Sequence, residues 1–248
     1  MKRILLKIAY DGTAYHGWQI QPNAVTVQEV LQNSLEKVLG VKTGVTGCSR
    51  TDAGVHAKEF FAHLDCDDPI PDTAFLKGLN SVLPPDIAVT GCREVEKDFH
   101  ARYNANGKTY IYRIYQGCEK NPFLSRYTWH IEQSLDTEKM NELLRKIVGT
   151  HDFYALSSSG RTVEDTVRTV RECYAEKKDD IITIRITADG FLYNMVRIIA
   201  GSAVDTALGR VKAENFEEIY KTKDRSRAGI TAPPNGLMLE KVDYNGRI

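Results

Sequence analysis

One stretch organises the chain: Gly47-Cys48-Ser49-Arg50-Thr51-Asp52-Ala53-Gly54-Val55-His56-Ala57. It follows neither helical nor strand periodicity, whereas Val45 ends one β-branched piece and Lys58 begins another. We therefore expect a loop carried by two strands, with Asp52 on it. Gly47 and Gly54 bracket Asp52, and glycines permit a left-handed backbone or the close approach of another chain segment. The residues alone also allow an ordinary turn in which Asp52 caps local amides.

The segments around this loop predict a β-α-β-β-α-β order. Alternating apolar residues up to Tyr10 predict a first strand, and the capping box Thr26-Val27-Gln28-Glu29 starts a helix that Gly40 ends. After the two strands that flank the loop, we expect a short helix from Pro71 to Ser81. A strand from Ile87 to Val95 then completes the set.

The same order restarts after Arg102. We expect strands at 108–116, 163–177, 181–188 and 237–243, and helices at 135–148, 192–208 and 213–222. Apart from one extra helix, this repeats the first half. We therefore predict an α+β protein of two ferredoxin-like βαββαβ halves, 1–104 and 105–248, whose sheets meet.

Composition narrows the class of protein. No apolar run reaches membrane-spanning length and no signal-peptide cleavage region follows Met1, so we expect a soluble cytoplasmic protein without membrane contact. The five cysteines lie far apart without a C-x-x-C pair, which argues against a disulfide framework and a zinc site. The 33 basic and 33 acidic residues cancel, so RNA binding would require basic charge gathered on one face.

Six motifs together resemble one family. The stretch SRTDAGVHA (Ser49 to Ala57) closely resembles the signature of the bacterial tRNA pseudouridine synthase A family. Five further motifs match it in the family's order: YDGTAYHGWQIQ (Tyr10 to Gln21), DFHARYNA (Asp98 to Ala105), KTYIYRI (Lys108 to Ile114), FLYNMVR (Phe191 to Arg197) and GLMLEKVDY (Gly236 to Tyr244). The resemblance thus extends over nearly the whole chain.

The resemblance implies a function and a site. It implies the pseudouridine synthase fold with an RNA-binding cleft between two α+β domains, and a homodimer acting on uridines in the anticodon stem and loop of tRNA. Asp52 is then the catalytic carboxylate at the junction of sugar and base. The sequence leaves open whether Asp52 attacks the base, attacks C1′ or removes a sugar proton.

Other residues are candidates for binding the substrate. Arg197 lies in an apolar helical run and, by resemblance, would pair with Asp52, although a snorkelling or structural role is equally compatible with the sequence. By resemblance, Tyr110 would stack on the target base, but strand alternation puts Tyr112 on the same face, so the sequence equally allows a core role for either tyrosine. Further candidates for contacting RNA are Arg50, Arg102, His16, Trp18 and Gln19, each of which also has a purely structural interpretation.

Two alternatives compete with an isomerase. The first is an RNA-binding module without chemistry, although the RNP1 pattern is absent from Lys58 to Leu64. The second is a metal-dependent hydrolase built on His56, His63 and Asp52, for which no recognised ligand spacing exists. Since neither metal-ligand spacing nor a nucleotide-binding glycine motif is present, we predict no metal and no organic cofactor.

Overall fold

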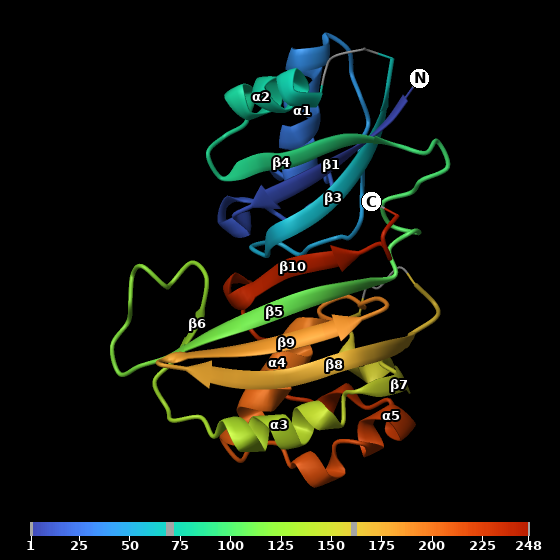
Figure 1. Ribbon diagram of the computed structural model, residues 1–248. Coiled ribbons are helices and arrows are strands. Elements are labelled where there is room, and N and C mark those ends of the chain that lie inside the picture. Colours follow the sequence, from blue (N-terminus) through green and yellow to red (C-terminus); the bar gives the residue numbers. More distant parts are fainter. Residues whose placement is uncertain (1, 68–71, 160–162, 248) are drawn as a thin grey trace. The chain divides into compact units, whose positions relative to one another are not determined.

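The computed structural model describes residues 2–67, 72–159 and 163–247. The chain forms two compact units, shown in Figure 1: unit 1 comprises Met1–Asn106 and Leu239–Ile248, and unit 2 comprises Gly107–Met238. The predicted halves, 1–104 and 105–248, stay a prediction. The compact units differ from them because the C-terminal segment joins unit 1.

Unit 1 has the predicted β-α-β-β-α-β order. Its elements are β1 (Lys2–Tyr10), α1 (Val27–Leu39), β2 (Thr46–Gly47), β3 (His56–Cys66), α2 (Asp72–Val82) and β4 (Ile87–Val95). β1 lies between β4 and β3 and is antiparallel to both, while β2 pairs with β3 through Thr46 and His63. Helices α1 and α2 contact each other beside this sheet (Figure 1). The arrangement confirms the ferredoxin-like prediction for this half.

Local sequence signals explain the bounds of α1. The Thr26 hydroxyl accepts a hydrogen bond from the Glu29 amide, and Gly40 ends the helix in the left-handed region at φ 70°. Leu31 and Leu35 are fully buried, as the helical spacing predicted. Pro71, expected to open the next helix, lies outside the described residues.

The C-terminal segment completes unit 1. Tyr244 is buried, its ring lies 5.4 Å from Phe61 and 5.3 Å from Phe99, and its hydroxyl donates to the Ala101 carbonyl at 2.6 Å. The Asn106 amide donates to the Asp243 carbonyl at 2.8 Å. The end of β10 (Leu237–Asp243) and Tyr244 therefore help to build the core that the first 106 residues begin.

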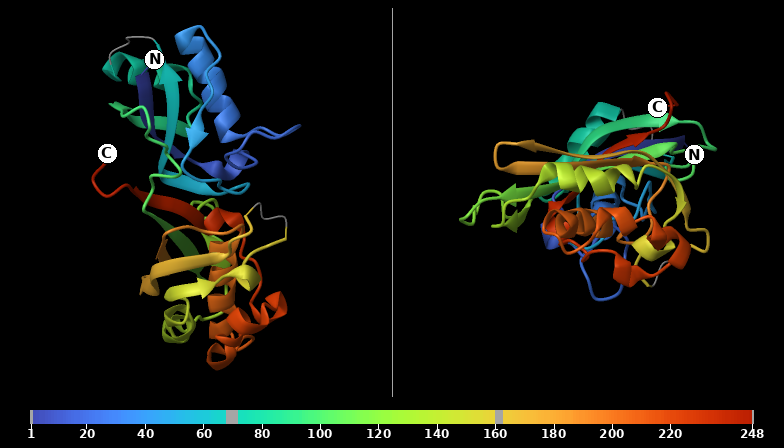
Figure 2. Two further views of the ribbon diagram at one scale, coloured as in Figure 1. Left: turned by 90° about the vertical axis from the view of Figure 1, so that its right-hand side faces the viewer. Right: turned by 90° about the horizontal axis from the view of Figure 1, so that it is seen from below.

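Unit 2 also mixes strands and helices. Its elements are β5 (Gly107–Gln116), β6 (Trp129–Ile131), α3 (Thr137–Arg145), β7 (Gly149–Asp152), β8 (Val167–Lys178), β9 (Ile181–Ala188), α4 (Met195–Ala207) and α5 (Glu218–Thr222). The strand order is β5-β9-β8-β7, and β6 runs parallel to β5. Helices α3 and α4 contact each other, and Figure 2 shows them on one side of the sheet.

Several details of unit 2 differ from the expected elements, including β8 and α4, which begin at Val167 and Met195 and so later than expected. The helix expected over 213–222 is divided into a 3-10 turn at Ala213–Asn215 and the short α5, because tight bonds at Phe216 interrupt the α-helical ladder. Helix α3 begins at Thr137, since Asp136 caps it by accepting from the Glu138 and Lys139 amides. Strands β6 and β7 were not predicted, because they are too short to show a period.

Among the helices of the described ranges, none combines the length and the apolar character that crossing a bilayer needs.

Candidate active site

Asp52 lies on the connection between β2 and β3, as expected. A tight turn holds it: the Val55 amide donates to the Asp52 carbonyl at 3.1 Å, and Gly54 adopts φ 77°. The Asp52 side chain is partly exposed. The glycine predicted to supply a left-handed angle is therefore Gly54, while Asp52 itself keeps an ordinary backbone.

The opening motif braces this loop through hydrogen bonds. The Trp18 amide donates to the Thr51 carbonyl at 3.1 Å, and the Gly54 amide donates to the Tyr15 carbonyl at 3.1 Å. The Tyr10 and Thr51 hydroxyls lie 2.8 Å apart within the core. These bonds fix the backbone immediately before and after Asp52.

Two glycines allow the motif to lie directly on the loop backbone. A Cβ at Gly17 would sit 2.5 Å from the Thr51 carbonyl oxygen and 3.1 Å from the Asp52 carbonyl carbon. A Cβ at Gly12 would overlap the Val55 carbonyl oxygen. Because real Cβ atoms essentially never come that close, only glycine fits at either position. The backbone at Gly12 and Gly17 therefore packs directly against the backbone on both sides of Asp52 and restrains it.

Trp18 supports the loop from inside unit 1. Its side chain is 3% exposed, and its ring lies 4.1 Å from the Phe60 ring. A Cβ at Gly47 would lie 2.6 Å from the indole nitrogen, so Gly47 makes room for this ring. Packing accounts for Trp18 in the structure, and its predicted contact with RNA stays a prediction. By contrast, His16 and Gln19 are exposed on either side of it.

His56 and His63, the two histidines of the hydrolase hypothesis, are hydrogen-bonded to backbone amides. His56 Nδ1 accepts from the Gly12 amide at 3.0 Å and lies 3.1 Å from Asp11 Oδ1. His63 Nδ1 accepts from the Ala101 amide at 3.1 Å. Within the described ranges, no cluster of three or more His, Cys, Asp and Glu side chains is arranged to hold a metal ion. The geometry gives the hydrolase interpretation no support.

The two candidate arginines of unit 1 reach solvent. Arg50 lies on the Asp52 loop and is exposed. Arg102 is also exposed, on the turn after Phe99, with its guanidinium carbon 5.8 Å from the ring centre of Tyr103. Their predicted contacts with RNA phosphates stay predictions.

The structure distinguishes the two tyrosines of β5. Tyr112 is fully buried, and its hydroxyl donates to the Pro233 carbonyl at 2.8 Å, so it belongs to the core. Burial raises the pKa of Tyr112 far above its ordinary value. Tyr110 is also buried, at 6% exposed, and packs edge to face on Phe191, with ring centres 5.0 Å apart. Its predicted stacking on the base stays a prediction.

Arg197 lies in the first turn of α4 and binds two neutral acceptors. Its Nε donates to the Ala232 carbonyl at 2.7 Å, and its Nη1 donates to Asn194 Oδ1 at 2.8 Å. Asn194 is itself left-handed at φ 61° and donates to the Ser158 hydroxyl. The predicted pairing of Arg197 with Asp52 joins residues of different units and stays a prediction.

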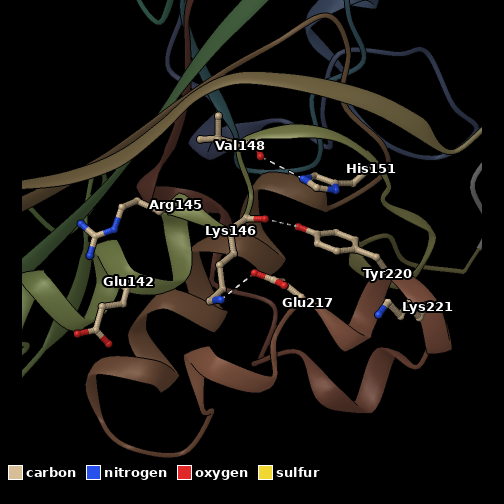
Figure 3. Close-up of a pocket in the computed structure, with 8 residues that line it drawn as sticks. All are labelled: Glu142, Arg145, Lys146, Val148, His151, Glu217, Tyr220 and Lys221. Atoms are coloured by element: carbon tan, nitrogen blue, oxygen red, sulfur yellow. Dashed lines mark hydrogen bonds and ion pairs between the residues drawn. The ribbon is translucent and has the colours of Figure 1, made fainter.

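Unit 2 carries a hollow of about 570 Å³. Figure 3 shows the side chains that line it. Lys146 pairs with Glu217 at 2.8 Å, and Tyr220 donates to the Lys146 carbonyl and stacks on His151. The lining includes none of the predicted site residues. Because its basic groups are interspersed with Glu142 and Glu217, the hollow has no clear preference for an anion.

Comparison with known proteins identifies the family. A family model described as tRNA pseudouridine synthase matches residues 7–104 and 143–245. A relative from Thermoanaerobacter sp. (strain X514), named tRNA pseudouridine synthase A, is 47% identical over 98% of this chain and 100% of its own. Relatives from Clostridium botulinum (strain Eklund 17B / Type B) and Clostridium perfringens (strain 13 / Type A), named tRNA pseudouridine synthase A and tRNA pseudouridine synthase A 2, are 45% and 44% identical over the same shares.

The chain belongs to the tRNA pseudouridine synthase family. This confirms the resemblance that the six motifs suggested. The structure of this tRNA pseudouridine synthase also shows residues that position the Asp52 loop, a role that the motifs alone did not indicate. Gly12, Gly17 and His56 hold the Asp52 loop, and the only sequence signal for this was the pair of glycines in the opening motif.

Proposed function

We propose that the protein converts uridines in the anticodon stem and loop of tRNA to pseudouridine, with Asp52 as the catalytic carboxylate. The observation that carries the proposal is the match to tRNA pseudouridine synthases along almost the whole chain. The clamped loop supports the role of Asp52. A reacting group must be held to a fraction of an ångström, and backbone-on-backbone contact at Gly12 and Gly17 restrains this loop in that way.

The chemistry balances within one nucleotide. The bond from C1′ to N1 breaks, the uracil turns, and a bond from C1′ to C5 forms. C5 loses a proton and N1 ends with one, so substrate and product are isomers and no oxidant or second substrate is consumed. Whether the carboxylate attacks the base, attacks C1′ or takes a sugar proton, it must be ionised at the start.

The remaining site residues divide by chemistry. Tyr110 offers an aromatic ring for stacking on the target base, and such stacking is worth about 1–3 kcal/mol per base. Arg197 offers a guanidinium, a group that can support an anion, and part of it is held by the Ala232 carbonyl and Asn194. Arg50, Arg102, His16 and Gln19 are exposed polar groups suited to phosphate and ribose contacts. We keep Trp18 as a candidate that acts through the position of the Asp52 loop.

The test is release of tritium from tRNA labelled at uracil C5, together with Asp52→Asn. This change keeps the size of the side chain and removes its charge, so folding and tRNA affinity should persist while turnover is abolished. Asp98→Asn, on the exposed surface of the same unit, is the matched control and should keep wild-type turnover. Turnover of Asp52→Asn within about tenfold of wild type, which is about 1.4 kcal/mol in barrier, would rule out the assignment.

We also propose that the protein works as a homodimer in the cytoplasm, as the family resemblance implies. The mass of the purified protein in solution, measured by light scattering across a range of concentrations, tests the dimer. A monomer that turns over at the full rate would exclude a need for the second subunit.

A further inference from the structure

The exposed turn at His100-Ala101-Arg102-Tyr103-Asn104 is held more firmly than its position suggests. The Asn104 side-chain oxygen accepts from the His100 amide at 2.6 Å, and the Asn104 amide donates to the His100 carbonyl at 3.0 Å. Ala101, at the centre of the turn, is fully buried. Its amide donates to His63 and its carbonyl accepts from Tyr244, so both of its polar groups are anchored to unit 1. The turn is therefore preorganised.

The His100 ring supports the outer part of the turn. Its Nδ1 accepts from the Arg102 and Tyr103 amides at 3.1 and 3.3 Å, which requires an unprotonated Nδ1. Burial, together with the charge of Arg3, lowers the pKa of His100 and favours that neutral form. The His100 ring lies edge-on to the His63 ring at 4.9 Å and under the Tyr103 ring at 4.2 Å. The rings of His63, His100 and Tyr103 therefore contact one another in series, from the buried His63 to the exposed Tyr103.

Tyr103 ends this series in solvent. Its side chain is 75% exposed, and the Arg102 guanidinium lies over the ring at 5.8 Å. Apart from its contact with His100, most of the Tyr103 ring stays in water and therefore stabilises the fold little. We propose that Tyr103, with Arg102 beside it, is a stacking platform for an unpaired nucleobase of the tRNA. This inference rests on the proposed function.

The chemistry of the platform favours a nucleobase over other partners. Unpaired bases in RNA are bound by stacking on aromatic rings and on guanidinium planes, and both are present here side by side. The guanidinium also attracts the phosphate that every nucleotide brings with it. Because His100 holds the ring beforehand, binding costs little side-chain entropy.

The experiment measures binding of an unmodified tRNA transcript to the full-length protein at several salt concentrations. Tyr103→Ala should raise Kd by about 5- to 150-fold, the range expected for one stacked base, with the slope of log Kd against log salt unchanged. Tyr103→Phe keeps the ring and should bind as wild type, and Tyr103→Leu keeps bulk without a flat face and should resemble Tyr103→Ala. Arg102→Ala should raise Kd as well. It should in addition reduce the slope of log Kd against log salt by about one, because one phosphate contact is lost.

Two controls make the result specific. Tyr154→Ala removes a matched exposed tyrosine, 39% exposed with the Lys223 ammonium 5.6 Å from its ring centre, and should leave Kd unchanged. A blunt RNA duplex offers no unpaired base, so wild type and Tyr103→Ala should bind it equally.

Some outcomes would overturn the inference. Equal tRNA affinity of wild type and Tyr103→Ala, or an equal loss for the duplex, would exclude a stacking platform. A change in the solution mass of Tyr103→Ala would instead make the ring a contact between protein subunits. If wild type makes pseudouridine while Tyr103→Ala binds tRNA normally, only this inference fails. If wild type releases no tritium from labelled tRNA, the proposed function fails first.

Discussion

The clamp on the Asp52 loop can be tested with one methyl group. Gly17→Ala places a Cβ 2.5 Å from the Thr51 carbonyl oxygen, whereas real Cβ atoms keep at least 3.0 Å. The loop must therefore retreat by about 0.5 Å, and such a shift of a catalytic group costs on the order of 10- to 100-fold in turnover. The left-handed angle of φ 86° adds about 1 kcal/mol of strain, and weakening the bond from the Trp18 amide to Thr51 adds about 1 kcal/mol more.

Gly40→Ala is the matched control for this experiment. Gly40 is also left-handed, at φ 70°, but a Cβ there meets nothing within 4 Å. It should lose about 1 kcal/mol of unfolding free energy through strain alone and keep its turnover. Urea denaturation measures the stability of both variants, and tritium release measures kcat. If Gly17→Ala keeps kcat within twofold of Gly40→Ala, the clamp does not position Asp52 and the reasoning is refuted.

Three further predictions concern charge. Arg197→Met should move the acid limb of activity toward neutral pH if the guanidinium supports ionised Asp52, and an unshifted pH profile would assign Arg197 to another anion. Affinity for tRNA should fall steeply with salt, by a log-log slope of about −0.9 for each duplex phosphate contacted, whereas a flat dependence would contradict a basic face. Burial, with the charge of Arg3, lowers the pKa of His63 to about 4, so the folded protein should lose stability as pH falls from 6.5 to 4, where the unfolded chain takes up a proton at His63 and the folded chain does not. Denaturation of His63→Gln over that range should show a flatter pH dependence than wild type.

Most helices and strands could be predicted from the periodic spacing of apolar residues. The capping box at Thr26 and the glycine at Gly40 predicted both ends of α1 correctly, because capping depends on residues that are neighbours in sequence. The same reasoning failed over 213–222, where Phe216 is buried between two short turns and tertiary packing overrides the helical pattern. Strands of three or four residues, such as β6 and β7, are too short for alternation to be recognised.

The site could be predicted only in part, for a similar reason. Asp52 stood out because acid and small residues broke the surrounding period, and Tyr112 could be recognised as core only through its bond to the Pro233 carbonyl. The sequence allowed Trp18 to contact RNA or to pack in the core, and its packing on the Phe60 ring could not be predicted because the two residues lie 42 positions apart in sequence. Contacts between segments far apart in sequence, such as Gly17 on Thr51, depend on the completed sheet.

The return of the C-terminal segment to unit 1 has a consequence for synthesis on the ribosome. Unit 2 is continuous in sequence and can fold as soon as residue 238 emerges, whereas unit 1 lacks Tyr244 until residues 239–248 have emerged as well. The unit that carries Asp52 is thus begun before unit 2 and completed after it. An interrupted chain would release Asp52 on an unfinished core, so incomplete products should be cleared by proteases before they can act on tRNA.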